Sequence, residues 1–234
     1  TMIGKKNLYG RRLSRPLSAH KKNLMSGLLL AISVPAEKME TARALAPSAL
    51  FEHPKQAYWM EIGFGNGEHL IALLEQYPDV GFLAAEPFIN GMANFLSALS
   101  GTGKAAHVRV LMDDAMGLVS ALMDRSLERI YVLNPDPWPK KRQQKRRIIQ
   151  QESLAEFHRV LKPGGMLVLA TDVDDLAGWM VTETMRHGGF DWQAERAADW
   201  QNPPEWWSKT TRYAEKGAKA GRRQSYLIFE KIEK

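Results

Sequence analysis

Residues 61–67 read Glu-Ile-Gly-Phe-Gly-Asn-Gly, and this turn joins two patterns that decide the fold. The apolar run 56–62 before it predicts a short strand. The segment 68–77 after it places apolar residues on one side of a helix, namely Leu70, Ile71, Leu73 and Leu74. A glycine-rich turn between a strand and a helix is typical of α/β proteins that bind a ligand at that turn.

Strand and helix patterns continue to alternate beyond this unit. Further strands are predicted at 80–85, 108–112, 128–133, 166–171 and 226–231, and further helices at 89–100, 115–123, 146–160 and 176–187. We therefore expect a mostly parallel, doubly wound α/β sheet with helices on both faces.

Acidic residues stand at the ends of successive predicted strands. Because the carboxyl ends of parallel strands meet at one edge of such a sheet, these side chains should converge where ligands usually bind. They are Glu61, Glu86, Asp114, Asp136 and Asp172.

The glycine turn favours S-adenosylmethionine as the cofactor. Its G-x-G-x-G pattern lacks the spacing of dinucleotide binders and the G-K-[ST] ending of phosphate-binding loops, although a dehydrogenase is the closest rival. Glu61 suits a cationic amino-acid group, Glu86 can accept from ribose hydroxyls, and Asp114 or its neighbour Asp113 can meet the adenine amino group. We expect these acids and Gly63, Gly65 and Gly67 to bind the cofactor.

A stiff loop follows the strand predicted at 128–133. It reads Asn-Pro-Asp-Pro-Trp-Pro over residues 134–139, and its three prolines restrict the backbone. Trp138 offers a face on which a base can stack, and Asp136 can accept from N1–H and N2–H of guanine. Guanine N7 carries a lone pair and no proton, so its methylation needs alignment and charge stabilisation rather than a general base.

Basic residues cluster in two places within the 234-residue chain, whose formal net charge is +6. Residues 1–36 contain no acid, and residues 140–147 read Lys-Lys-Arg-Gln-Gln-Lys-Arg-Arg. Clusters of this kind usually contact a polyanion, which favours RNA as the partner. We expect a basic N-terminal arm over 1–45, which can be flexible without RNA, and a methyltransferase domain over 46–234.

Composition argues against other classes. The chain has no cysteine and its histidines show no ligand spacing, so we expect no metal. The longest apolar stretch, 27–34, is too short to span a bilayer, and we expect a cytoplasmic protein without membrane contact. The sequence leaves the oligomeric state open, with a monomer favoured.

The loop at 134–139 and the basic run after it resemble the hallmark of the bacterial tRNA (guanine-N7-)-methyltransferases. Other segments match in order: Leu8–Arg12, Glu61–Glu68, Ala170–Asp172 and the C-terminal segment from Thr211 to Leu227. The resemblance covers nearly the whole chain, from Leu8 to Phe229, and the proline-tryptophan loop is its most specific part.

The resemblance implies a seven-stranded class I methyltransferase (Rossmann-like) fold and methylation of the guanine at tRNA position 46. It places Asp136 at the catalytic centre and Glu61, Glu86 and Asp114 at the cofactor. It implies substrate contacts for Lys140, Asp172, Thr211, Arg212 and Glu215, and RNA contacts for Arg11, Arg12, Arg142, Lys145, Arg146 and Arg147.

One position departs from the family pattern, which usually reads Thr-x-Tyr/Phe-Glu. This chain has Ala214 at the last of these positions and Glu215 next to it. Two other functions stay open at this stage. One is an amino-methyltransferase acting on an exocyclic amine of nucleic acid or protein, and the other is a non-catalytic RNA-binding module on the same fold.

Overall fold

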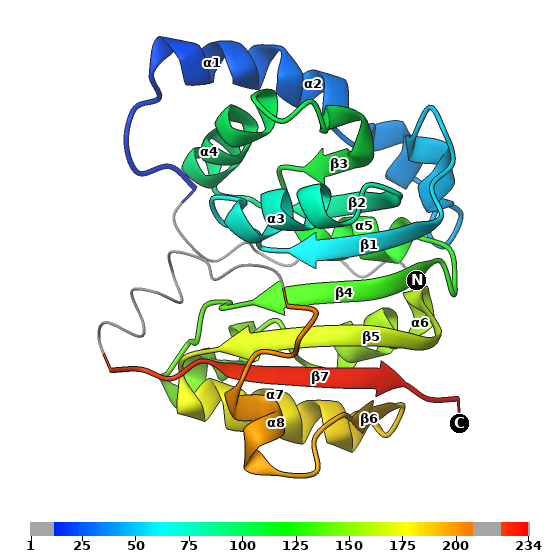
Figure 1. Cartoon of the computed structure of the whole chain (residues 1–234), viewed down its shortest axis with the longest axis vertical. Coiled ribbons are helices and arrows are strands. Elements are labelled where there is room, and N and C mark those ends of the chain that lie inside the picture. The colour runs from blue at the N-terminus through cyan, green and yellow to red at the C-terminus, as the bar shows by residue number, and fades with distance from the viewer. Residues whose placement is uncertain (1–11, 208–220, 234) are drawn as a thin grey trace.

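The computed structural model describes residues 12–207 and 221–233. Seven strands form one sheet in the order β3-β2-β1-β4-β5-β7-β6 (Figure 1). The strands from β1 to β5 run parallel, whereas β7 runs antiparallel to both of its neighbours. The bounds are β1 Ala57–Ile62, β2 Val80–Ala85, β3 Val108–Leu111, β4 Leu127–Leu133, β5 Leu161–Thr171, β6 Phe190–Trp192 and β7 Ser225–Lys231.

The helices alternate with the strands, as the sequence predicted. The α-helices are α1 Ala19–Ser26, α2 Leu28–Ile32, α3 Glu68–Gln76, α4 Ile89–Ser100, α5 Ala115–Ala121, α6 Gln151–Val160, α7 Asp174–His187 and α8 Ala197–Gln201. Short 3-10 helices are η1 Ala36–Met39, η2 Pro47–Leu50, η3 Ala105–His107 and η4 Lys141–Arg146. This arrangement confirms the expected α/β class and the seven-stranded, doubly wound sheet.

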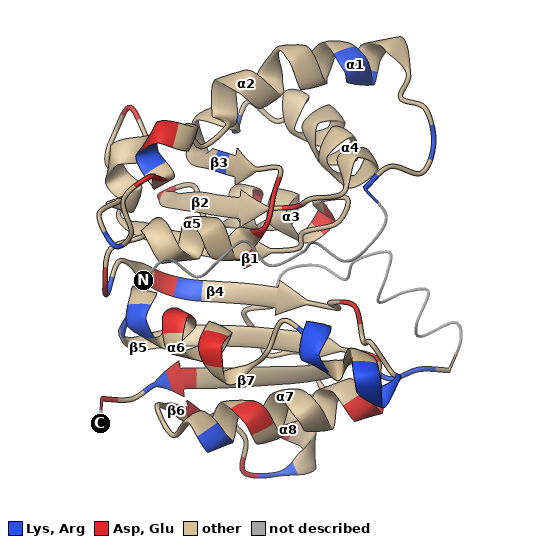
Figure 2. Cartoon of the chain, turned by 180° about the vertical axis from the view of Figure 1, so that it is seen from behind, with Lys and Arg blue, Asp and Glu red and all other residues tan. Residues whose placement is uncertain are grey.

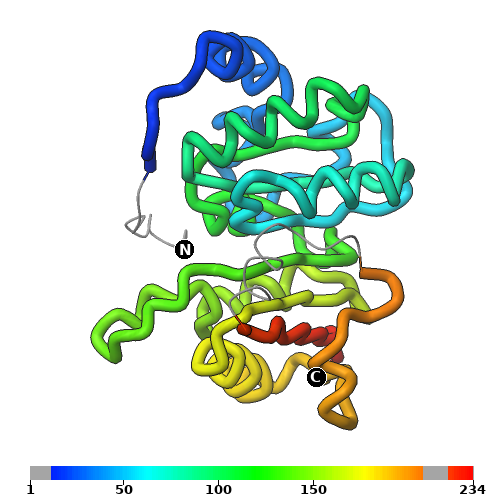
Figure 3. Tube along the Cα trace, turned by 60° about the vertical axis from the view of Figure 1, so that its left-hand side comes forward, coloured from blue at the N-terminus to red at the C-terminus, as the bar shows by residue number. Residues whose placement is uncertain are grey.

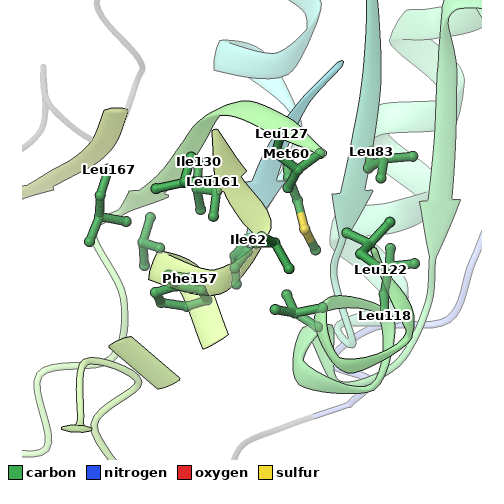
Figure 4. Close-up of a cluster of buried hydrophobic side chains, with 14 of the residues drawn as sticks. Met60, Ile62, Leu83, Leu118, Leu122, Leu127, Ile130, Phe157, Leu161 and Leu167 are labelled. Carbon is green, nitrogen blue, oxygen red and sulfur yellow. The ribbon is translucent and has the colours of Figure 1, made fainter. Parts of the chain in front are cut away.

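Each face of the sheet is covered by its own hydrophobic cluster. In β1, Met60 and Ile62 belong to the cluster that α5 and α6 cover, whereas Ala57 and Trp59 belong to the opposite one. This alternation follows from the two-residue period of a strand. Figure 4 shows part of the first cluster, with side chains from α5, α6 and the neighbouring strands around Met60 and Ile62.

The second cluster is rich in aromatic side chains and is covered by α2, α3 and α4. Trp59 lies edge-on to Phe82 at 5.8 Å between ring centroids, and Trp207 lies edge-on to Tyr226 at 4.8 Å. The two layers together fix the carboxyl ends of β1, β2 and β4 as a rigid edge, because buried side chains pack densely.

Two predicted boundaries were wrong, and two elements were missed. The helix predicted from residue 146 begins at Gln151, where the backbone N–H of Gln150 donates to Ser153 Oγ at 3.0 Å and caps it. The like charges of 140–147 disfavour an α-helix, because side chains four residues apart repel. The strand predicted from residue 166 begins at Leu161, so the Pro-Gly-Gly at 163–165 lies inside β5, where the register with β4 shifts. The short strand β6 and the helix α8 were missed.

The predicted N-terminal arm is partly built into the domain. Leu29 and Ile32 of α2 are buried in the aromatic cluster, and Val34 and Leu45 are buried in the other one. The predicted division at residues 45 and 46 is therefore not a division between separate cores. Among the residues that the structure describes, no helix has both the length and the apolar character that a membrane span requires.

Candidate active site at the carboxyl edge of the sheet

A cavity of about 720 Å³ opens at the edge where the parallel strands end. Figure 2 shows acidic segments following β3 and β4 at this edge. The loops after β1, β2, β3 and β4 all contribute to the cavity, which brings Gly63, Glu86 and Asp136 to one site as the sequence required. Its polar and charged lining residues include Arg12, Ser14, Glu86, Asp113, Asp114, Asn134, Asp136, Lys145, Arg146, Arg147, Glu152 and Ser153.

The first wall is the glycine loop after β1. Gly63 and Gly65 have φ angles of +69° and +57°, in the left-handed region that favours glycine. Both line the cavity, and a Cβ added to either would meet no atom within 4 Å. The backbone of this loop is therefore bare toward the cavity, so a ligand can approach it closely.

Gly67 has a different place. It precedes α3 with a φ of +77°, and an added Cβ would lie 2.3 Å from a ring carbon of Phe95. This glycine lets the loop pack against α4 and does not line the cavity. Its predicted contact with a cofactor remains a prediction.

Glu86 follows β2 and ties two loops together. Its Oε2 accepts from the backbone N–H of Gly65 at 2.7 Å, and its Oε1 accepts from that of Phe88 at 2.8 Å. Burial raises the pKa of Glu86, the two hydrogen bonds oppose this, and the nearby carboxylates of Asp136 and Glu61 raise it further. Each oxygen keeps further acceptor capacity, which suits a pair of ligand hydroxyls.

Glu61 does not line the cavity. Its carboxylate is buried and lies 3.1 Å from His69 Nδ1, on the side of the sheet that carries the aromatic cluster. The ring of His69 in turn packs against Tyr131 and Trp207. Glu61 lies one residue before the cavity wall, and its predicted role toward the cofactor stays a proposal.

Asp113 and Asp114 both line the cavity after β3. The Oδ1 atom of Asp114 accepts from Met116 N at 3.0 Å and thereby caps α5. The Oδ1 atom of Asp113 accepts from Asp114 N at 2.8 Å. The structure therefore leaves both acids as candidates for the same ligand group.

The second wall is the segment after β4, which extends as a long loop away from the sheet before it returns to α6 (Figure 3). Asn134 and Trp138 have φ angles of +48° and +43°, although neither is glycine. Such angles cost energy and persist only where other contacts hold them. One contact is the hydrogen bond that Gln224 Nε2 donates to Asn134 Oδ1 at 2.9 Å.

Asp136 and Trp138 lie on this loop and line the cavity. Burial raises the pKa of Asp136 above its ordinary value, because a carboxylate is less stable away from water. The sequence identified both residues, but it gave no signal for their backbone geometry.

The basic run after the loop divides into cavity-lining and outward residues. Lys145, Arg146 and Arg147 line the cavity, whereas Lys140 and Arg142 are exposed outside it. The guanidinium of Arg146 lies over the ring of Trp138 at 5.0 Å from its centroid. Arg147 is buried, and its Nε donates to the carbonyl of Pro137 at 2.9 Å. Arg147 is therefore not placed as the exposed phosphate contact that the sequence predicted, because its side chain points inward.

Asp172 follows β5 and is paired. Its Oδ2 atom accepts from Arg222 Nε at 2.6 Å, and the carboxylate is almost completely buried. Asp172 does not line the cavity. The predicted contacts of Arg11, Thr211, Arg212 and Glu215 fall on residues outside those that the structure describes.

A short N-terminal segment closes one side of the cavity. Arg12 and Ser14 line it, and Asn90 of α4 holds Ser14 and Arg15 in place. The Asn90 side chain accepts from Ser14 N at 2.8 Å and donates to Arg15 O at 2.9 Å. Sequence reasoning missed Asn90, because an asparagine near the start of a helix gives no sign of a partner 75 residues away.

These residues fit S-adenosylmethionine better than a metal. The bare glycine backbone and the carboxylate of Glu86 suit an adenosine group, and the acids around them suit a positive charge. Within the described ranges, no group of three or more His, Asp or Glu side chains is arranged to hold a metal ion.

Comparison with known proteins assigns the family. A family model described as "Putative methyltransferase" matches residues 55–227. A tRNA (guanine-N(7)-)-methyltransferase of Rhizobium johnstonii is 41% identical over 224 residues, which is 96% of this chain and 94% of the relative. One from Brucella anthropi is 42% identical over 226 residues, covering 97% and 95% of the two chains. The chain belongs to the tRNA (guanine-N(7)-)-methyltransferase family.

Structural comparison agrees on the fold. The crystal structure of the 16S rRNA methyltransferase KamB superposes with a TM-score of 0.57 at 13% identity, over 82% of this chain and all of that one. At this identity the likeness concerns the fold alone. Together the comparisons confirm the resemblance and the class I methyltransferase fold expected from the sequence.

Proposed function

We propose that this protein transfers a methyl group from S-adenosylmethionine to N7 of a guanine in tRNA, at position 46 of the variable loop. The observation that supports it best is the cavity itself, which joins the bare glycine loop to the Asp136–Trp138 loop. The family to which the chain belongs has the same activity in its name. A tRNA substrate also favours action in the cytoplasm, and we propose a monomer as the active form.

The glycine side of the cavity is proposed to hold the cofactor, whose sulfonium supplies the methyl group. The carboxylate of Glu86 accepts the ribose hydroxyls, and Gly63 and Gly65 let the ligand lie against the backbone. Asp114, or Asp113 beside it, accepts from the adenine amino group. Glu61 does not line the cavity. Its negative charge is proposed to act on the cofactor from beneath the loop that contains Gly63.

The proline side is proposed to hold the guanine. Trp138 stacks on the base while Asp136 accepts from its N1–H and N2–H. As N7 gains the methyl group the purine becomes positively charged, and the carboxylate of Asp136, which lines the cavity, stabilises that charge. No proton leaves N7, so this mechanism needs alignment and not a base.

The rim is proposed to hold the tRNA backbone. The proposed contacts are Lys140, Arg142, Lys145 and Arg146 after the proline loop and Arg12 of the N-terminal segment that lines the cavity. Arg11, which lies outside the described residues, is proposed to contact RNA as well. Phosphate contacts of this kind orient the RNA, while Asp136 and Trp138 select the base. Asp172, Thr211, Arg212 and Glu215 are proposed to contact the substrate.

Mapping the methylated nucleotide tests the proposal. Unmodified tRNA transcripts with guanine or adenine at position 46 are incubated with the protein and S-adenosylmethionine, and the product is digested and sequenced by mass spectrometry. We expect 7-methylguanine at position 46 of the first transcript and no methylation of the second. Methylation of an exocyclic amine, or of another position with equal efficiency, would contradict the proposal.

A further inference from the structure

Arg147 belongs to the exposed basic run by sequence but not by position. Its side chain is 1% exposed, whereas Lys140 and Arg142 in the same run lie at the surface. A buried guanidinium is costly unless its N–H groups and charge are matched by partners. The partners of Arg147 therefore indicate what the residue does.

Those partners lie on two different elements. The Nε atom donates to the carbonyl of Pro137 at 2.9 Å, within the proline loop. The Nη2 atom pairs with the carboxylate of Asp175, and the guanidinium lies over the ring of Trp179 at 4.9 Å from its centroid. Asp175 and Trp179 are four residues apart on α7 and so share one face of that helix.

The proline loop needs support of this kind. Three of its six residues are prolines, which have no backbone N–H. The backbone of the loop is therefore held mainly through hydrogen bonds to its carbonyl groups. Pro137 lies between Asp136 and Trp138, and Trp138 has the strained φ of +43°. A donor fixed at Pro137 O thus restrains both side chains that face the base.

We propose that Arg147 is a positioning residue, which clamps the proline loop to α7 and so aims Asp136 and Trp138 into the cavity, without contacting tRNA phosphates. The guanidinium of the adjacent Arg146 lies over the ring of Trp138 and so restrains the same loop. The two arginines therefore have different tasks: Arg146 faces the cavity beside the stacking ring, and Arg147 anchors the loop from within. The inference rests on the proposed function where methyl transfer is the readout.

The clamp can be tested from both of its ends. Arg147→Lys keeps the charge but loses the planar fork and the stacking on Trp179. Asp175→Asn weakens the clamp at a side chain that is 65% exposed and outside the cavity. Arg186→Lys, at an α7 position that is 63% exposed and outside both the basic run and the cavity, is the matched control. For each variant the turnover number, the Kd for tRNA at several salt concentrations and the Kd for S-adenosylmethionine are measured.

We expect Arg147→Lys to lower kcat at least about tenfold, with both dissociation constants changed less than about threefold and the salt slope of tRNA binding unchanged. Asp175→Asn should lower kcat less, and the double variant should lose less than the product of the two effects, because both act on one clamp. Arg186→Lys should leave kcat intact. An unchanged kcat in Arg147→Lys, or a loss confined to the Kd for tRNA, would overturn the proposal and indicate a phosphate contact.

A readout without substrate separates this inference from the proposed function. Trypsin should cleave after Lys140 and Lys141 faster in Arg147→Lys than in the parent, because the released loop opens, while circular dichroism shows an unchanged fold. If Arg147→Lys fails to fold, Asp175→Asn provides both readouts. A parent protein that does not methylate tRNA would defeat the proposed function, whereas equal cleavage of variant and parent would defeat the clamp.

Discussion

The two loops that form the walls of the cavity follow neighbouring parallel strands, yet they achieve their shape in opposite ways. The loop after β1 takes left-handed backbone angles at Gly63 and Gly65, where such angles cost little. The loop after β4 takes similar angles at Asn134 and Trp138, where they are strained. The first loop therefore holds its own shape, whereas the second depends on contacts from elsewhere.

The sources of those contacts show what the difference means. The glycine loop is bound by Glu86 of the next strand, through the backbone N–H of Gly65. The proline loop is held by Gln224, next to β7, and by Arg147, which reaches α7. The proposed cofactor wall is thus held by a residue of the neighbouring loop. The proposed base-reading wall instead depends on how α7 and the segment before β7 pack against it.

The largest effect of a backbone change on cofactor affinity is expected from breaking the glycine wall. Gly65→Ala places a side chain at a φ of +57°, which costs roughly 1–2 kcal/mol, and directs it into the cavity. We expect the Kd for S-adenosylmethionine to rise about 5-fold to 30-fold, measured by isothermal titration calorimetry.

Gly103→Ala is the matched control for this prediction. Gly103 has a φ of +68° with open space at its Cβ, but it lies outside the cavity. Its substitution should lower stability by a similar amount while cofactor affinity stays at the parental value. Equal losses of affinity in both variants would show that strain, and not the position at the cavity, explains the effect.

A smaller effect is expected from pH, and it should act on the proline wall. Burial raises the folded-state pKa of Asp136, so its carboxylate becomes protonated at a higher pH than an ordinary aspartate does. Methyl transfer should therefore fall as pH decreases through that raised pKa. In single-turnover assays the acidic limb of the rate should disappear in Asp136→Asn, whose residual rate should be independent of pH there.

The same shift has a consequence for stability with a defined sign. A carboxyl group with a raised folded-state pKa stabilises the fold below its unfolded pKa, and this contribution is lost as pH rises through the folded value. At neutral pH the ionised Asp136 is therefore a cost to folding. Asp136→Asn should be at least as stable as the parent at pH 7 in thermal unfolding, and a clear loss of stability there would contradict the raised pKa of Asp136.

The smallest effect concerns the outer rim. Arg142→Ala should weaken tRNA binding a few-fold and reduce the slope of log Kd against log salt by about one, because one phosphate contact is lost. The control is Arg186→Ala on α7, which is 63% exposed but lies outside the basic run and should leave the slope unchanged. Identical slopes for parent and Arg142→Ala would mean that Arg142 is only a solvated side chain.

The contrast between the walls also explains what the sequence could predict. Alternating strand and helix patterns were sufficient for the sheet, because hydrophobic periodicity is local, and strand-end position was sufficient to bring Glu86, Asp114 and Asp136 together. The pairing of Glu61 with His69 could not be foreseen, since it depends on how α3 packs. The burial of Arg147 could not be foreseen either, because nothing in the sequence distinguishes it from the exposed basic residues beside it.

The contribution of residues 19–45 to the two hydrophobic clusters could not be predicted for a related reason. Residues 19–45 show poor periodicity because α1 and α2 are short: α1 buries no side chain, and α2 buries only Leu29 and Ile32. Their place on the sheet is set by tertiary contacts with α4. The Asn90 contacts to Ser14 and Arg15 belong to the same class of information.

The most direct test of the account compares Glu86→Gln and Asp136→Asn in one pair of measurements, cofactor affinity by calorimetry and the single-turnover rate with saturating cofactor and tRNA. We expect Glu86→Gln to raise the Kd for S-adenosylmethionine at least about tenfold. We expect Asp136→Asn to change this Kd less than about threefold but to lower the rate at least about a hundredfold. A near-parental rate in Asp136→Asn, or equal losses of affinity in both variants, would contradict the division of the cavity into two walls.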